Sequence, residues 1–261
     1  MIDINNDDVH IGENCTIGKN VILENVKIGN NCKIGDNVFL KSVSIGDHSI
    51  IQNNSVIGYS TLSGHYHDQK QPKDYSNNLK NQNYRIILGK NVLIRTAVTI
   101  YMDVSIGNNC WINHNAIIRE KVTILEDSTI GSNTILENDV SIGKRCVIHN
   151  NTMICAETLI ESFVFIGPGV SFTNNSPIGH LRDVPSTIYG AKLRLGCAIG
   201  GGSTICPGIC GRHLPDQRPP VHYTPSLHPD HLNRYSRHPA NPCAELCRGF
   251  RIGAITTGSP C

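Results

Sequence analysis

The residue best suited to acid–base chemistry in this sequence is His114, in the stretch "INHNAI" (residues 112–117). Neighbouring six-residue stretches such as "IGNNCW" and "IGSNTI" carry Asn or Ser where this one carries histidine. An imidazole changes charge near neutral pH, so it can take a proton from an attacking group or donate a hydrogen bond to a developing oxyanion. The competing interpretation is a solvated side chain, because polar residues fill this place in most of the repeats.

The elements that must position His114 follow a period of six residues. A large apolar residue stands at every sixth position from Leu88 to Phe172, and a small or β-branched residue stands four positions after each as far as Val170. A helix repeats about every 3.6 residues and a simple strand about every two, whereas a period of six fits short strands joined by tight corners. Three such strands predict one triangular coil of eighteen residues, around a core of stacked aliphatic side chains.

The N-terminal part shows the same pattern with a period of seventeen, as in Ile11, Ile28 and Ile45. The pattern breaks between Gly58 and Arg85, where the chain is polar and rich in Asn, Gln, Lys and Tyr. We expect one loop, residues 59–85, to be extruded from a corner there. Long insertions of this kind serve an active site or an interface, or are plain solvated loops, and both interpretations stay open.

Composition excludes several classes of function. The formal net charge is +2 with both signs interspersed, so we expect no nucleic-acid or membrane partner. No apolar run approaches the ~18 residues of a spanning helix, and no targeting signal begins the chain, so we expect a cytoplasmic protein. Four of the cysteines occupy the small-residue place of the repeat and are predicted to be buried hydrophobes: Cys15, Cys32, Cys110 and Cys146.

Stacking of eighteen-residue coils predicts three polar columns, gathered near one corner, with His114 two residues into the side that leads to it. The columns are Thr96, His114, Ser132, Asn150 and Pro168; Met102, Glu120, Asn138, Ala156 and Asn174; and Asp103, Lys121, Asp139, Glu157 and Asn175.

Three stretches, "HNAIIRE" (114–120), "FIGPGVSFTNN" (165–175) and "GCAIGGGSTICPGI" (196–209), resemble the hexapeptide-repeat acyltransferases. They are most similar to N-acetyltransferases of nucleotide-linked amino sugars, and the resemblance covers residues 9–58 and 86–209. It implies an all-β fold, a left-handed parallel β-helix, in a homotrimer. Acetyl-coenzyme A would lie between neighbouring chains with the amino sugar beside it, and no metal is expected.

The resemblance, the polar columns and the close approach that glycine permits together predict roles for individual residues. These are catalytic roles for His114 and Asn174, substrate binding by Glu120, Asn138, Glu157 and Asn175, and cofactor binding by Gly167, Gly169, Ala198, Gly200 and Gly201. Asn175 replaces an aspartate of the family, and Ala156 replaces a glutamate of some relatives. For the asparagines and glycines, the alternative is a purely structural role in the corner turns. His149 and His180 are interpreted as surface residues.

The last segment, residues 210–261, is rich in Pro, His, Arg and Cys and lacks the repeat. Proline removes ladder donors, so we expect a β-helix domain of residues 1–209 and a poorly ordered, atypical tail. The cysteine and histidine spacing of this tail matches no zinc motif. Two alternatives to the transferase remain: a non-catalytic trimeric scaffold or sugar-binding protein, and zinc hydration chemistry at His65, His67 and His114.

Overall fold

The computed structural model of the chain describes residues 2–4, 8–59, 62–63, 73–74, 85–176, 187–188 and 190–211. The chain divides into two compact units, Met1–Thr224 and Pro225–Cys261, and the second unit lies wholly outside the described residues. Every regular element in the described ranges is a β-strand. None of these ranges contains a helix long and apolar enough to cross a membrane.

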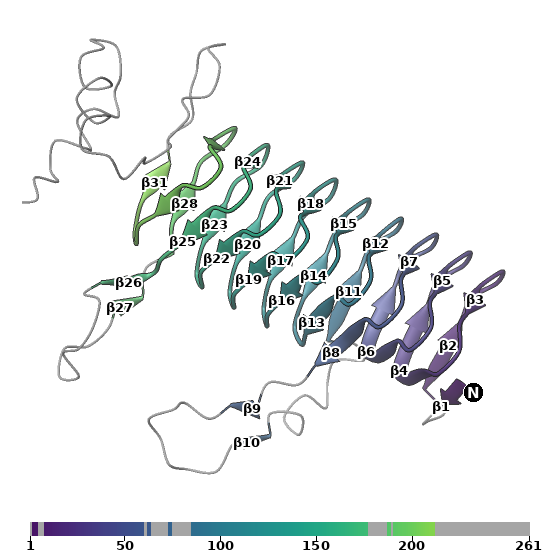
Figure 1. The fold of residues 1–261 in the computed structure, drawn as a ribbon. Helices are drawn as coiled ribbons and strands as arrows, with labels where there is room; N and C mark the ends of the chain where they lie inside the picture. The colour runs from purple at the N-terminus through teal and green to yellow at the C-terminus, as the bar shows by residue number, and fades with distance from the viewer. Residues whose placement is uncertain are drawn as a thin grey trace, which may run out of the picture. The chain divides into compact units, whose positions relative to one another are not determined.

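The strands stack as the coils of a left-handed parallel β-helix with three faces (Figure 1). Each coil adds one short strand to each face, and strands of successive coils pair in parallel. This confirms the fold class predicted from the period of six. We number the faces so that the chain passes from the first to the second to the third in each coil.

The first face contains β2 (Val9–Ile11), the second half of β4 (Val21–Ile28), the second half of β6 (Phe39–Ile45), β11 (Ile86–Leu88), β14 (Ser105–Ile106), β17 (Thr123–Ile124), β20 (Ser141–Ile142), β23 (Leu159–Ile160), β28 (Lys192–Leu193) and β31 (Cys210–Gly211). The second face contains β3 (Thr16–Ile17), β5 (Lys33–Ile34), β7 (Ile50–Ile51), β12 (Leu93–Ile94), β15 (Trp111–Ile112), β18 (Thr129–Ile130), β21 (Val147–Ile148), β24 (Phe165–Ile166) and β29 (Ala198–Ile199).

The third face contains β1 (Ile2–Ile4), the first halves of β4 and β6, β8 (Val56–Tyr59), β13 (Thr99–Tyr101), β16 (Ile117–Ile118), β19 (Ile135–Leu136), β22 (Met153–Ile154), β25 (Ser171–Phe172) and β30 (Thr204–Ile205). The chain therefore turns three corners in each coil. The first corner follows the first face, the second corner follows the second face, and the third corner leads from the third face to the first face of the next coil.

The core is the predicted column of aliphatic side chains. Ile94, Ile112, Ile130 and Ile148 are register partners along the second face, and each is almost completely buried. The small-residue place is filled by buried Val, Ala, Cys, Ser or Thr; the Ser128 hydroxyl, for example, donates to the Gly143 carbonyl of the next coil at 2.9 Å. The buried hydroxyls are thus satisfied, which avoids the cost of an unpaired polar group.

The corners require a left-handed backbone conformation. Asn31, Asn115 and Asn133 occupy corner positions with φ between 55° and 57°, and asparagine tolerates this region better than most residues. The same position is taken by Asp103, Lys121, Asp139 and Glu157 at the third corner. Asparagine side chains also form ladders between coils, as from Asn115 Nδ2 to Asn133 Oδ1 at 3.2 Å.

Two insertions leave the solenoid at the third corner. The first follows β8 and carries the antiparallel pair β9 (Leu62–Ser63) and β10 (Lys73–Asp74), within the loop predicted at residues 59–85. The second follows β25 and begins and ends with the antiparallel pair β26 (Asn175–Ser176) and β27 (Thr187–Ile188), visible beside β25 in Figure 1. The sequence analysis did not predict the second insertion. Across it Ile160 pairs with Leu193, so the ladder continues in register.

Candidate functional site

His114 lies in the second-corner turn between β15 and β16, and its side chain is exposed. Its backbone carbonyl accepts a hydrogen bond from Asn133 N at 2.9 Å, and Asn115 N donates to Thr96 O at 3.1 Å. Equivalent bonds continue the column through Ser132, Asn150 and Pro168. The structure therefore confirms the predicted stacking of this column and presents the imidazole outward from it.

The glycines predicted to bind a cofactor lie further along the same corner. Gly167 is buried, and a Cβ there would lie 2.5 Å from Gly201 N of the next coil, so close packing of coils already requires glycine. Gly169 has a φ of +67°, a left-handed conformation, with open space around it. Gly200 and Gly201 form the corner of the following coil, whereas Ala198 lies within β29 on the second face. Corner geometry accounts for these glycines, and a role in binding a coenzyme stays a prediction.

The residues predicted to bind substrate lie at the third corner. Arg119 holds the carboxylate of Glu120 in a fork, with Nε to Oε2 at 3.2 Å and Nη2 to Oε1 at 2.9 Å. In the next coil Asn138 Nδ2 donates to Asp139 Oδ2 at 2.8 Å, and Glu157 beyond it is exposed.

Asn174 is half-buried, directly before β26, and the side chain of Asn175 lies outside the described residues. Ala156 is buried, and its N–H donates to Glu137 Oε2 at 2.9 Å. A carboxylate from the preceding coil therefore contacts the backbone of the residue that the sequence analysis notes as an alanine in place of glutamate.

Within one chain the predicted residues form two separate sets. His114 and the predicted glycines occupy the second corner, whereas Glu120, Asn138, Glu157 and Asn174 occupy the third corner. The expectation that all of the polar columns gather near one corner is corrected here. Each six-residue phrase forms one strand and one corner. Residues six positions apart therefore lie at successive corners of the coil.

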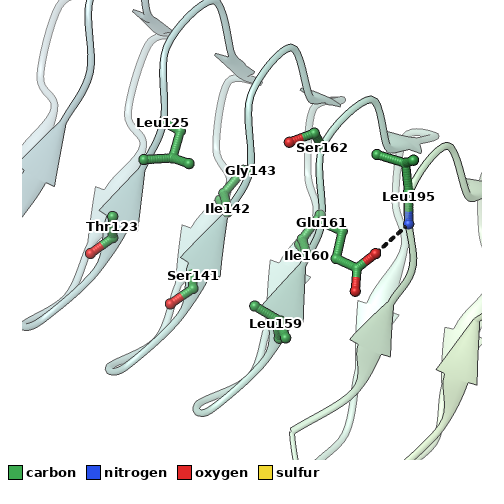
Figure 2. A pocket seen from close by; sticks show the side chains of 10 residues that line it. All are labelled: Thr123, Leu125, Ser141, Ile142, Gly143, Leu159, Ile160, Glu161, Ser162 and Leu195. Carbon is green, nitrogen blue, oxygen red and sulfur yellow. Dashed lines mark hydrogen bonds between the residues drawn. The ribbon is translucent and has the colours of Figure 1, made fainter.

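A shallow depression lies on the first face and its edge at the first corner (Figure 2). Leu125, Leu159 and Leu195 border it, and Gly143 leaves room between them. Glu161 is fixed at its end by Arg194 Nη1 at 2.7 Å and by the N–H of Leu195 at 2.8 Å. None of the residues predicted to act at a site lines this depression. In the sequence, the only sign of this depression is Gly143, which stands eighteen residues after Leu125 and eighteen before Glu161 at the first corner.

The buried thiols of Cys110 and Cys155 are not poised as nucleophiles. Desolvation is the main cause that raises the pKa of Cys110 and of Cys155 to about 11, so both stay protonated thiols at neutral pH. Cys32, Cys110 and Cys146 are buried as predicted, and Cys15 is half-buried.

Metal chemistry gains no support from the part of the chain that the structure describes, where no group of three potential ligands converges. Of the histidines in the zinc alternative, His65 and His67 lie outside that part, so this alternative stays untested. His180, interpreted as a surface residue, also lies outside it. His149 is exposed at the second corner, and its ring meets the Phe165 ring edge-on at 5.2 Å between centroids.

Comparison with known proteins agrees with this architecture. Residues 8–42, 25–59, 103–138 and 121–156 match the family model described as bacterial transferase hexapeptide (six repeats). These segments, which together span less than half of the chain, are similar to that family's hexapeptide repeats, the repeat that the sequence analysis predicts. No curated protein sequence matches the chain.

Solved structures to which the chain is similar include the UDP-N-acetylglucosamine O-acyltransferase from Moraxella catarrhalis, which is 16% identical with a TM-score of 0.44 over 76% of this chain and 68% of the other. The UDP-N-acetylglucosamine acyltransferase from Bacteroides fragilis is 18% identical, with a TM-score of 0.42 over 82% and 70%. The enzyme of the same name from Campylobacter jejuni is 19% identical, with a TM-score of 0.42 over 80% and 70%.

Proposed function

We propose that the protein is an acetyl-coenzyme A-dependent N-acetyltransferase that acts on a nucleotide-linked amino sugar as a homotrimer. The observation that carries this proposal is the exposed imidazole of His114 on a solenoid of transferase hexapeptide repeats. In this reaction the neutral sugar amine attacks the thioester carbonyl carbon, the carbon–sulfur bond breaks, and coenzyme A leaves as thiolate. The amine proton passes to His114 and from there to the thiolate.

The separation of the two predicted sets of residues supports a site made by two chains. His114 at the second corner and Glu120 at the third corner lie on opposite edges of the third face. In a closed trimer the second corner of one chain can face the third corner of its neighbour. Glu120, held rigidly by Arg119, would then contact the sugar, and Asn174 would lie beside the amine.

Replacement of His114 tests the proposal. The variant His114→Ala should fold, assemble and keep its affinity for acetyl-coenzyme A within a few-fold, yet lose ~10² to 10⁴ in turnover, because a positioned proton acceptor is removed. Thiol release from acetyl-coenzyme A measures turnover, with a panel of nucleotide-linked amino sugars as acceptors.

His149→Ala is the matched control, since His149 is an exposed histidine at the same corner two coils away. Its turnover should equal that of the parent protein. Parent-like turnover in His114→Ala would contradict the assigned role. Binding of a nucleotide sugar by the parent without any thiol release would favour the non-catalytic scaffold instead.

A further inference from the structure

Arg95 carries a buried donor that the fold does not use. It follows β12 at the second corner, one coil before His114, and its side chain is half-buried. Its Nε is the one buried side-chain nitrogen or oxygen without a hydrogen-bond partner among the described residues. An unpaired buried donor is costly, so a hydrogen-bond acceptor from outside the described residues would stabilise this one.

The other arginines of the described ranges are all paired with carboxylates. Arg85 pairs with Asp103, Arg119 with Glu120, Arg145 with Asp127 and Arg194 with Glu161. Arg95 has no ion pair in this part of the chain. Its backbone is nevertheless fixed, because its N–H donates to Ile112 O at 2.8 Å and its carbonyl accepts from the Ser55 hydroxyl at 3.0 Å. The backbone at Arg95 is therefore fixed, and its guanidinium has no carboxylate partner among the described residues.

The described residues of the second corner next to Arg95 include no Asp or Glu. The other two corners carry carboxylates, such as Asp47 and Glu126 at the first and Asp103 and Glu137 at the third. At the second corner the last carboxylate is that of Asp36, two coils before Arg95. After Asp36, the described residues of the second corner contain no Asp or Glu. These corner residues are 52–54, 95–97, 113–115, 131–133, 149–151, 167–169 and 200–202. A surface with one unpaired cation and no carboxylate attracts anions.

We propose that Arg95 binds a phosphate group of the ligand whose reacting end lies at His114. A guanidinium presents a planar set of N–H donors that matches phosphate oxygens, and Nε is part of that set. Neighbouring coils are ~4.8 Å apart, so Arg95 and His114 can contact one extended ligand. The identity of that ligand rests on the proposed function: both the nucleotide sugar and the coenzyme contain a pyrophosphate.

Binding of inorganic pyrophosphate, measured by calorimetry on the full chain, tests the proposal without reference to catalysis. Parent protein should bind pyrophosphate, and Arg95→Gln should bind it about 10- to 100-fold more weakly, as expected when a hydrogen bond to a charged group is lost. Arg145→Gln is the control, because it removes one cation at the first corner; its affinity should equal that of the parent. Failure of the parent to bind pyrophosphate, or parent-like binding by Arg95→Gln, would overturn the proposal.

A second set of titrations identifies the source of the phosphate. Coenzyme A is compared with pantetheine, and UDP with uridine, in the parent and in Arg95→Gln. Loss of affinity confined to coenzyme A assigns Arg95 to the coenzyme, and loss confined to UDP assigns it to the nucleotide. Equal weakening of pantetheine and uridine would show a structural role and refute phosphate binding. Absence of thiol release would refute the proposed acetyl transfer alone, because pyrophosphate binding does not depend on it.

Discussion

His114 and Asn115 are adjacent, yet the corner constrains them differently. Asn115 holds the left-handed conformation with a φ of 56°, whereas His114 precedes it and carries no such constraint. The residue before the left-handed position is free of this φ requirement, although at several corners its side chain accepts a hydrogen bond from the preceding coil, as Asn150 Oδ1 does from Ser132 N at 2.8 Å. Glu157, predicted to bind substrate, occupies the left-handed position with a φ of 60°, so its backbone serves the turn whatever its carboxylate contacts.

Cys110 predicts a dependence of stability on alkaline pH. Burial raises the pKa of its thiol to about 11, whereas an unfolded cysteine ionises near pH ~8.5. Between these values the unfolded chain loses a proton that the folded chain retains. The contribution of this group is therefore fully present below pH ~8.5 and is lost as the pH rises towards 11.

Cys110→Val should reduce this loss, because valine fills the same small-residue place at Val92 and Val98. The measurement that checks this is the melting temperature of the parent and the variant, taken between pH 8 and 11 in steps of ~0.5 pH units. Cys206→Ala, at an exposed thiol, should follow the parent curve. An identical pH dependence for Cys110→Val and the parent would rule out the ionisation of Cys110 as a cause.

At the scale of the element, each strand is too short to be stable alone and depends on the coils on either side. Ile130 in β18 is fully buried between its register partners Ile112 and Ile148. In such a stack the stability is mainly a sum of contacts between neighbouring repeats. A defect in one coil should therefore loosen its neighbours first.

Ile130→Asn places an amide without a partner in this column. The expected cost is ~1 to 3 kcal/mol beyond the lost packing, so the melting temperature should fall. Thr129→Asn is the matched control, because Thr129 precedes Ile130 in β18 and points outward. An unchanged melting temperature for Ile130→Asn would show that Ile130 does not point into the core.

At the scale of the whole molecule, the second face presents apolar side chains outward. Ile50, Trp111, Val147 and Phe165 are all exposed there, and Trp111 has 51% of its surface accessible. Exposed apolar patches commonly mark a surface that associates with another protein. The predicted homotrimer would cover such a surface, and it would also bring two different corners together.

Light scattering should give the mass of a trimer for the parent protein. Trp111→Glu should shift it towards monomer, because a charge is then buried at the interface. Thr123→Glu on the first face, at the equivalent outward place of a strand, should remain trimeric. A parent protein that is only monomeric would exclude a site shared between two chains.

The sequence by itself determined the coil, its core and its columns. Each inward side chain recurs after a constant number of residues, and a slip in register would turn the apolar set outward, so the spacing leaves one solution. Ile94, Ile112 and Ile130 pair as that spacing predicts.

Only the tertiary structure decided where the ladder resumes after residue 176, and that Nε of Arg95 lacks a partner among the described residues. Leu193 pairs with Ile160 across an insertion that has no repeat, because backbone pairing between coils sets that register and local spacing does not. The orphaned Nε of Arg95 depends in the same way on which side chains of neighbouring coils surround it. Those contacts join residues far apart in the chain, and no local pattern contains them.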